Sequence, residues 1–449
     1  MDLPLLNVLS GQKPREIAAQ VLAGRLAGDD YVENLLEKGL SRAALSPADR
    51  GLCQELVYGV VRWQATLDWL IARKTGRRPQ KPPLQILLRL GLYQIFWLDR
   101  IPDHAAVNET VDQARRGGFG PQAGFVNAVL RGYLREDDAT KQLLADLKRT
   151  QPALGHSHPD WLAARWQQRW GAEKTARLME WNNTPPKTFA RINPLRFKER
   201  KFKNAGDLLA QWRDENVEYD FVRRDWFEDN LVFELKSHPP LATLPSFKQG
   251  LFYVQDPGTL LAVRELNPQS GEAILDLCAA PGGKTTYLAQ LMQNKGRLVA
   301  HDTSPDRLKL VEENCARLGV TCVECLPASE NRQSPIANRQ FDRVLLDAPC
   351  SNTGVMGRRV DLRWRFRLEE LERLRKVQLD LLRRAAPLLK PGGTLVYSTC
   401  SLEPEENREV VERFLKDQPG FKLEGERELL PFADAVDGVF VARLARLPS

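Results

Sequence analysis

Two cysteines follow two short apolar runs, and this repeated arrangement is the feature of the sequence that most directly suggests chemistry. The run Phe341–Asp347 leads into Ala-Pro-Cys350-Ser, and the run Gly392–Tyr397 leads into Ser-Thr-Cys400-Ser. A continuous apolar run bounded by turn residues is typical of a strand buried on both faces of a sheet. Ligands bind at the carboxyl edge of open α/β sheets, so we expect the two thiols to form one active site there.

A third motif lies earlier in the chain, where a predicted strand, Ala273–Leu277, ends in a loop of small residues. The loop reads Cys278-Ala279-Ala280-Pro281-Gly282-Gly283-Lys284 and opens a predicted helix. Its spacing matches neither a Walker A loop nor the G-x-G-x-x-G of dinucleotide-binding proteins. Asp302 ends the next predicted strand, where a carboxylate can accept hydrogen bonds from both hydroxyls of a ribose. Together these features indicate S-adenosylmethionine; the alternative for Asp302 is a helix cap.

The thiols and the carboxylate beside them favour chemistry on carbon. Pyrimidine C5 is a poor nucleophile, but a thiolate that adds to C6 makes C5 enamine-like, so that C5 can attack a sulfonium methyl group. Asp347 is placed to supply an acid near N3 of the base, and Lys284 can polarise the base or lower the pKa of a thiol. Methylases of exocyclic amines carry an aromatic residue where Cys350 stands, which argues against nitrogen chemistry. Either cysteine satisfies the requirement for the attacking thiol.

From Leu251 onward, predicted strands alternate with predicted helices, which indicates a parallel sheet with crossover connections. We therefore expect an α/β, Rossmann-like class I methyltransferase domain over residues 251–449. The expected strands are Ala273–Leu277, Gly296–Ala300, Thr321–Leu326, Val344–Asp347 and Thr394–Tyr397, with Gly438–Leu444 closing the sheet, and the expected helices are Thr285–Met292, Pro305–Leu318 and Glu405–Lys416.

Residues 1–140 predict an all-α bundle of about six or seven helices, because apolar residues recur at helical spacing and runs rich in β-branched residues are missing. Four segments of this bundle are distinctive: Leu56-Val57-Tyr58-Gly59-Val60, Leu87–Gln94, Pro102–Glu109 and Phe125–Arg131. On these segments, the bundle resembles the NusB-like helical RNA-binding fold. A basic stretch, Ala72–Lys81, is either a solvated turn or a loop that contacts phosphates.

Residues 141–250 predict a small α+β RNA-binding subdomain followed by a linker. His158–Leu162 opens a helix, Asn182–Lys187 interrupts it, and Thr188–Asn193 alternates like a strand. His156 and His158 have no Cys or carboxylate partner close by in the sequence, so we expect a structural loop there. Cys315, Cys322 and Cys325 fall short of the four ligands of a zinc site, and we expect no metal centre.

The bulk properties point to an anionic partner. The chain has 449 residues, a net charge of +7 and a pI of about 9.0, which favours nucleic acid. No run approaches the roughly 18 apolar residues of a membrane span, and the start lacks a secretory signal. We therefore expect a monomer in the cytoplasm, with seven reduced cysteines and no membrane partner.

Motif for motif, Tyr253–Leu444 resembles the Nop2/Sun family of RNA 5-methylcytosine methyltransferases. With the NusB-like module in front, the whole chain is similar to the RsmB-like bacterial branch, which acts on small-subunit (16S) ribosomal RNA. The resemblance implies that Cys400 is the nucleophile and that Cys350 assists product release. It also implies that the loop Cys278–Lys284, Asp302 and Asp347 line the cofactor site.

Two further stretches bear on this resemblance. Arg191-Ile192-Asn193 matches the family's R-V/I-N motif, which supports it. Ala328 stands where the family has an aspartate near the adenine, although Ser329 or Glu330 can substitute for that residue. This departure puts cofactor affinity in doubt and leaves every group that does chemistry in place.

Arginines interleaved with aromatic residues follow the Cys350 loop, at Arg358-Arg359 and Arg363-Trp364-Arg365-Phe366-Arg367. This pattern suits contacts to RNA phosphates and bases. The alternative is a basic helix start with Trp364 in the core. We favour RNA contacts for the arginines and leave both interpretations open for the aromatic residues.

The expected function is transfer of a methyl group from S-adenosylmethionine to C5 of a cytosine in 16S ribosomal RNA, through a covalent Cys400–C6 intermediate. The target cytosine has to leave its stack, because the thiol attacks from above the ring plane. One alternative is an RNA adaptor whose methylase domain has lost its cofactor, motivated by Ala328. Another is a DNA cytosine methylase with Cys350 as nucleophile, which the lack of a large target-recognition insert disfavours.

Overall fold

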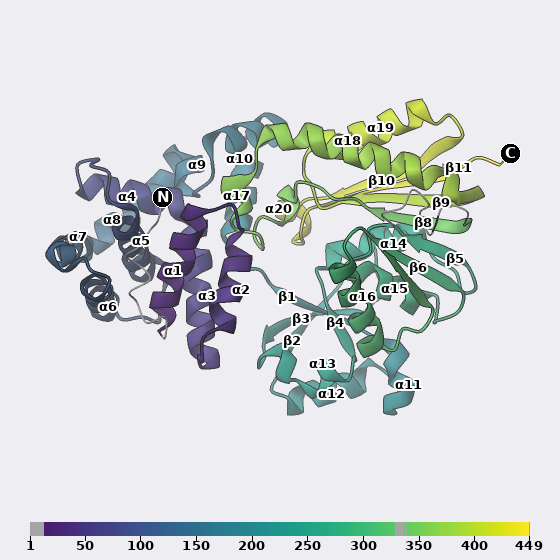
Figure 1. Cartoon of the computed structure of the whole chain (residues 1–449), viewed down its shortest axis with the longest axis horizontal. Helices are drawn as coiled ribbons and strands as arrows, with labels where there is room; N and C mark the ends of the chain where they lie inside the picture. The colour runs from purple at the N-terminus through teal and green to yellow at the C-terminus, as the bar shows by residue number, and fades with distance from the viewer. Residues whose placement is uncertain (1–12, 328–335, 337–338, 449) are drawn as a thin grey trace. The chain divides into compact units, whose positions relative to one another are not determined.

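The computed structural model describes residues 13–327, 336 and 339–448, and the chain divides into two compact units. The first, called here the helical unit, comprises Met1–Pro185 together with Met356–Arg365. The second, called the sheet unit, comprises Pro186–Val355 and Phe366–Ser449. Figure 1 shows helices in the first and two sheets with covering helices in the second.

The helical unit confirms the all-α prediction for the start of the chain. Its longer helices are α1 (Pro14–Ala27), α2 (Val32–Ser41), α3 (Pro47–Arg62), α4 (Gln64–Lys74), α5 (Pro82–Trp97), α6 (Asp103–Arg116), α7 (Ala123–Leu134), α8 (Asp137–Thr150) and α10 (Asp160–Asn183), with the short α9 (Pro152–Gly155) before the last. The apolar α5 is buried along most of its length. It packs tightly on α3, because a Cβ at Gly59 would overlap the ring of Tyr93.

A short segment from much later in the sequence, Met356–Arg365, completes the helical unit and contains α17 (Leu362–Arg365). Asp361 is fully buried in it. Its Oδ1 accepts a hydrogen bond from Arg25 Nε at 2.6 Å, and its Oδ2 accepts one from the backbone N–H of Val32 at 3.1 Å. The carboxylate therefore joins this segment to α1 and to the start of α2.

Arg363 anchors the same segment at a second place and is also fully buried. Its guanidinium donates to Asn183 Oδ1 at 2.7 Å and to the backbone carbonyls of Asn182 at 2.9 Å and Arg62 at 3.2 Å. Burial holds the pKa of Arg363 well below its usual value. The prediction that Arg363 contacts RNA is therefore wrong, because its side chain is buried and its guanidinium donates to acceptors inside the protein.

Trp364 packs against the helical core and donates through Nε1 to the carbonyl of Val61 at 2.8 Å. The alternative interpretation of this aromatic residue, a place in the core, is thus confirmed. Arg365 pairs with Asp361 at 2.9 Å, whereas Arg359 and Arg367 are exposed. RNA contacts by these two exposed arginines stay a prediction.

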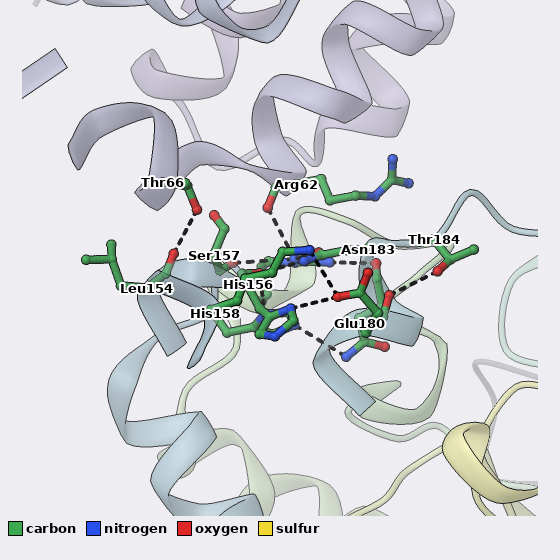
Figure 2. A network of polar contacts seen from close by, with 12 residues as sticks. Arg62, Thr66, Leu154, His156, Ser157, His158, Glu180, Asn183 and Thr184 are labelled. Atoms are coloured by element: carbon green, nitrogen blue, oxygen red, sulfur yellow. Dashed lines mark hydrogen bonds and ion pairs between the residues drawn. The ribbon is translucent and has the colours of Figure 1, made fainter. Parts of the chain in front are cut away.

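Figure 2 shows the polar network around the turn between α9 and α10, where His156 and His158 lie. Nδ1 of His158 is 2.8 Å from the carbonyl of His156, and Asn183 Nδ2 donates to the same carbonyl at 2.7 Å. His156 Nδ1 lies 3.1 Å from Glu180 Oε2. Both histidines thus hold the turn against the end of α10. Among the residues that the structure describes, no three His, Cys, Asp or Glu side chains are grouped so that they could hold a metal ion.

Replacing Asp361 with asparagine is expected to destabilise the helical unit by about 3–5 kcal/mol, because Arg25 would keep a buried charge without its carboxylate. Urea unfolding measures the loss of free energy. Asp30→Asn is the matched control, since the Asp30–Lys38 pair is 52% and 60% exposed and its loss costs at most about 1 kcal/mol. Equal shifts in the two variants would show that Asp361 is not a structural anchor.

The sheet unit begins with a small α+β subdomain after Pro186, whereas α10, the helix expected at the start of the predicted subdomain of residues 141–250, lies in the helical unit. The four-stranded sheet of the subdomain has the order β2 (Glu218–Val222), β3 (Val232–Ser237), β1 (Thr188–Ile192) and β4 (Phe252–Val254), with antiparallel pairing throughout. The short α11 (Phe197–Arg200) and α13 (Pro245–Lys248) and the longer α12 (Ala205–Asp214) accompany it. Trp212 of α12 stacks edge-on against Phe233 and Phe252, which fixes this helix on the sheet.

The larger sheet has seven strands in the order β10-β11-β9-β8-β5-β6-β7. Five of them are parallel, as predicted: β5 (Ala273–Asp276), β6 (Arg297–Asp302), β7 (Val323–Pro327), β8 (Phe341–Asp347) and β9 (Leu389–Thr399). In Figure 1, α18 (Leu368–Ala385) and α19 (Arg408–Asp417) cover one face of the sheet, and α14 (Leu260–Leu266), α15 (Gly283–Leu291) and α16 (Pro305–Leu318) cover the other. The short α20 (Pro431–Asp434) precedes the last strand.

The prediction of an all-parallel sheet is wrong at one end. The closing strand β11 (Val439–Arg446) runs antiparallel to β9, and an additional strand, β10 (Phe421–Leu429), pairs antiparallel to β11 at the sheet edge. Lys422, Glu424 and Glu426 of β10 are exposed and charged, as on other edge strands that avoid pairing with a second chain. Its sequence therefore lacks the apolar run that revealed the central strands.

Candidate active site

Cys350 and Cys400 meet at the carboxyl edge of the large sheet, as predicted. Strands β8 and β9 are parallel neighbours in which Asp347 pairs with Ser398, and each cysteine follows shortly after its strand. The two Sγ atoms lie 3.2 Å apart. At this distance both thiols can contact one and the same bound group.

Asn352 links the two cysteine loops and was not identified from the sequence. Its Oδ1 accepts a hydrogen bond from Cys400 Sγ at 3.0 Å, and its Nδ2 donates to the carbonyl of Cys350 at 2.8 Å. Its backbone φ is 60°, in the left-handed region that asparagine tolerates better than most residues. The Asn-Thr-Gly that follows Pro-Cys-Ser is the signal that could have identified it.

The contact between the two thiols affects the protonation of Cys350. Its hydrogen bond with Cys400 and its enclosed position hold the pKa of Cys350 well above the usual value. Cys350 is therefore a neutral thiol in the free protein near neutral pH. A thiol of this kind gives a strongly basic thiolate once it loses its proton.

An ion pair lies beside the thiols. Lys284 Nζ donates to Asp347 Oδ2 at 2.6 Å, and Ser398 Oγ donates to Asp347 Oδ1 at 2.7 Å. Burial alone would lower the pKa of Lys284, but the charge of Asp347 and its hydrogen bond outweigh burial and raise that pKa. Lys284 is thus a cation that holds a proton one hydrogen bond away from Asp347.

The loop from Cys278 to Lys284 connects β5 to α15 at the same sheet edge. Gly282 precedes the first turn of α15 with φ 101°, and a Cβ there would stand 3.3 Å from Val311. Asp276, the last residue of β5, is buried; Thr285 Oγ1 donates to its Oδ2, whereas its Oδ1 has no partner among the described residues. Burial raises the pKa of Asp276 to about 7. The site therefore combines a helix N-terminus with an unfilled acceptor.

Asp302 ends β6, next to β5, and is only 4% exposed. Its Oδ2 accepts from the backbone N–H of Ala280 at 3.2 Å, and its Oδ1 accepts from that of Ser304 at 3.1 Å. The N-cap of α16 is Ser304, whose side chain accepts from the N–H of Arg307. The alternative interpretation of Asp302 as the helix cap is wrong, and its carboxylate instead braces the glycine loop.

The Arg191-Ile192-Asn193 motif connects the small sheet to the glycine loop. Arg191 is buried; it donates to the carbonyl of Gly283 at 2.9 Å and to Thr286 Oγ1 at 3.0 Å. Asn193 Nδ2 donates to the carbonyls of Gly250 and Leu318, both at 2.8 Å. The motif therefore holds the start of α15 and the end of α16 in place.

Two other sequence-based expectations find no test in this site. Ala328, Ser329 and Glu330 follow β7 and lie outside the described residues. The three cysteines at positions 315, 322 and 325 are free thiols, and burial raises the pKa of each. None of the helices within the described ranges combines the length and apolar character that crossing a membrane requires.

Comparison with protein families gives matches along most of the chain. Residues 263–445 match the model described as 16S rRNA methyltransferase RsmB/F. Residues 12–135 match the NusB family, and residues 158–219 match the ferredoxin-like domain of RsmF/B-like methyltransferases. The NusB match lies in the helical unit, the ferredoxin-like match covers α10 and the first part of the small subdomain, and the methyltransferase match covers the large sheet.

Individual relatives are similar over almost the whole length. The probable ribosomal RNA small subunit methyltransferase B of Bacillus subtilis is 35% identical over 96% of this chain and 98% of its own. The ribosomal RNA small subunit methyltransferase B of Klebsiella pneumoniae is 35% identical over 92% of this chain and 96% of its own.

Solved structures show the same architecture. The crystal structure of PH0851 superimposes with a TM-score of 0.75 at 25% identity and covers 99% of both chains. A methyltransferase homologue from Pyrococcus horikoshii gives a TM-score of 0.55 at 31% identity, covering 66% of this chain and 97% of its own. NSun6 from the same organism, crystallised with SFG, shares the fold with a TM-score of 0.55 at 24% identity, over 65% of this chain and 99% of its own.

Proposed function

The chain belongs to the RsmB/F family of 16S rRNA methyltransferases, and from this premise we propose that it methylates C5 of a cytosine in 16S ribosomal RNA, with S-adenosylmethionine as methyl donor. The observation that carries the proposal is the pair of thiols 3.2 Å apart beside the Lys284–Asp347 ion pair. Methylation of an exocyclic nitrogen requires no thiol. Methylation of C5 requires one thiol that adds to C6 and activates the ring, and a second thiol can remove the C5 proton.

The glycine loop supports a bound S-adenosylmethionine. The N-terminus of α15 attracts a carboxylate, and the unpartnered Oδ1 of Asp276 can accept from an ammonium group. Asp302 ends β6, where a ribose is bound in related sheets. Cys278, Ala279, Ala280, Pro281, Gly282, Gly283, Lys284, Asp302 and Asp347 would line the site. When bound, this cofactor supplies an electrophilic methyl group.

Cys400 is the proposed nucleophile. Its thiolate forms a bond to C6 of the target cytosine, and the displaced π electrons move toward C4 and N3, which takes up a proton. Asp347 and Lys284 supply that proton, because Lys284 holds it 2.6 Å from the carboxylate. The ring is then enamine-like and carries the electron pair that C5 uses for methyl transfer.

Cys350 is proposed to end the reaction. Cys350 first gives its thiol proton to water. As a thiolate it then removes the proton from C5, the C5–C6 double bond forms again, and Cys400 leaves as a thiolate while N3 returns its proton to the Lys284–Asp347 pair. The high pKa of Cys350 makes its thiolate a strong proton acceptor for this step. In this scheme the Sγ atoms of Cys350 and Cys400 must both contact the same bound cytosine ring, as their 3.2 Å separation allows.

RNA binding is assigned to the parts outside the catalytic domain. We propose that the NusB-like residues 1–140 and the small subdomain of residues 141–250 hold the RNA, while residues 251–449 catalyse the transfer. The net charge of +7 supports an RNA partner. We further propose that the reaction takes place in the cytoplasm, because its proposed substrate is ribosomal RNA.

Bisulfite sequencing of 16S ribosomal RNA tests the proposed function. Cells that contain the protein are expected to show a protected cytosine that becomes convertible when the gene is removed and is protected again by the wild-type gene. Identical conversion with and without the gene would overturn the proposal.

Methylation of DNA in preference to ribosomal RNA by the purified protein would favour a DNA methylase. Isothermal titration with S-adenosylmethionine separates an enzyme from an RNA adaptor, since an adaptor would show no binding.

A further inference from the structure

One buried carboxylate, Glu406, lies directly behind the two cysteine loops. It belongs to the short 3-10 turn Pro404–Glu406, between Cys400 and α19, and it is fully buried. Nothing in the sequence distinguishes it from Glu405 in the same turn or from Glu403, which precedes the turn.

The carboxylate accepts hydrogen bonds from both cysteine loops at once. Its Oε2 accepts from the hydroxyls of Ser351 and Ser401, the second at 2.5 Å. Its Oε1 accepts from the backbone N–H of Ser351 at 2.8 Å and from Gln378 Nε2 at 3.0 Å. Gln378 Nε2 also donates to the carbonyl of Pro349 at 2.9 Å.

The two serines that donate to Glu406 are the residues next to the two cysteines. Ser351 directly follows Cys350, and Ser401 directly follows Cys400. Their hydroxyls lie 3.1 Å from each other and share one carboxylate oxygen. A displacement of Glu406 would therefore move Ser351 and Ser401 relative to each other, and with them the cysteines that precede them.

Glu406 is held as an acceptor without a cation. Burial raises its pKa, while the hydrogen bonds from Ser351 and Ser401 act in the opposite direction. The hydrogen-bond partners of its carboxylate in the described part of the chain are the neutral groups of Ser351, Ser401 and Gln378. Tyr397 adds a bond from its hydroxyl to the backbone carbonyl of Glu406 at 2.6 Å. Neutral donors thus fix this carboxylate in one orientation.

We propose that Glu406 is a positioning residue that sets the separation of Cys350 and Cys400 for methyl transfer, an inference that rests on the proposed function. Glu406 acts through Ser351 and Ser401, and through them keeps both thiols on one bound ring. A displacement of about 1 Å in such a constellation lowers a rate by about 10²-fold.

The Glu406→Gln variant is the first test, because it keeps the size of the side chain but replaces one acceptor oxygen with a donor. The single-turnover rate of RNA methylation is expected to fall by about 10²-fold, while the KM for S-adenosylmethionine and the affinity for RNA stay within about twofold. Glu412→Gln is the matched control, since Glu412 is 64% exposed on α19 and is expected to keep the wild-type rate. An unchanged single-turnover rate in Glu406→Gln would overturn the inference.

The rate of disulfide formation between the two thiols gives a readout that needs no methylation. Diamide, a diazenedicarboxamide oxidant, takes two electrons and two protons from a thiol pair, and peptide mapping identifies the Cys350–Cys400 disulfide. We expect this disulfide to form at least about tenfold more slowly in Glu406→Gln than in the wild type or in Glu412→Gln, because the thiols are no longer held together. Wild-type disulfide formation in Glu406→Gln would overturn the inference.

A second variant keeps the test informative if Glu406→Gln fails to fold. Ser351→Ala combined with Ser401→Ala removes the two hydroxyl donors and leaves the carboxylate in place. Slow disulfide formation is expected here too, and a wild-type rate in this folded double variant would overturn the inference. If the wild-type protein methylates no RNA, the proposed function is refuted. Slow disulfide formation in the Glu406→Gln variant would then still support the role of Glu406 in holding the two thiols together.

Discussion

Replacing Cys400 with alanine is expected to reduce methyl transfer to the background rate, a loss on the order of 10⁴-fold or more, because the C5 position has no other route to activation. Incorporation of tritium from the labelled methyl group into 16S ribosomal RNA measures the effect. The fold is expected to survive, since Cys400 is partly exposed at the sheet edge and its side chain is small.

The control for this experiment is Cys322→Ala, which removes a partly buried thiol away from the glycine loop. It is expected to retain nearly wild-type turnover. A Cys400→Ala protein that methylates at the wild-type rate would remove Cys400 as nucleophile. Activity in Cys400→Ala together with a complete loss in Cys350→Ala would reverse the order of the two thiols.

Replacing Cys350 with alanine is expected to trap RNA on the protein, because Cys400 can still add to C6 but the C5 proton is no longer removed efficiently. Turnover should fall to background while a covalent complex accumulates. A denaturing gel that resolves free protein from a slowly migrating protein–RNA species measures the trapping. Protease digestion of that species followed by mass spectrometry should find the base attached to Cys400.

The double variant Cys350→Ala, Cys400→Ala controls for trapping by other groups, and it is expected to form no slowly migrating species. A Cys350→Ala protein that turns over normally would contradict the role in product release. Trapping in the double variant would assign the covalent bond to a residue other than Cys400.

The central part of the site could be predicted because it depends on local patterns. The apolar runs before Cys350 and Cys400 identify buried strands, and parallel strands bring their carboxyl ends to one edge. The structure confirms that the two thiols meet there, 3.2 Å apart. The glycine loop and Asp302 likewise follow directly from the alternation of strands and helices.

The residues that hold the thiols could not be predicted, because their roles depend on contacts rather than on patterns. Asn352 and Glu406 are single polar residues between regular elements. Asn352 reaches from the Cys350 loop to Cys400, and Glu406 reaches from the Cys400 side to Ser351. The strand β10 was missed because its exposed, charged side chains hide the strand period. The prediction for Arg363 was wrong, because an arginine on a basic surface and an arginine buried among carbonyl oxygens look alike in sequence.

The place of Met356–Arg365 in the helical unit also has a consequence for how the chain is made. Arg25, near the start, keeps a buried charge whose carboxylate partner, Asp361, is translated 336 residues later. Domains of most proteins fold in order as they leave the ribosome. Here the first domain cannot finish folding until most of the last one has been synthesised, so a nascent chain must carry an incomplete helical bundle through most of its translation. A fragment ending at Pro185 would be left in that same unfinished state.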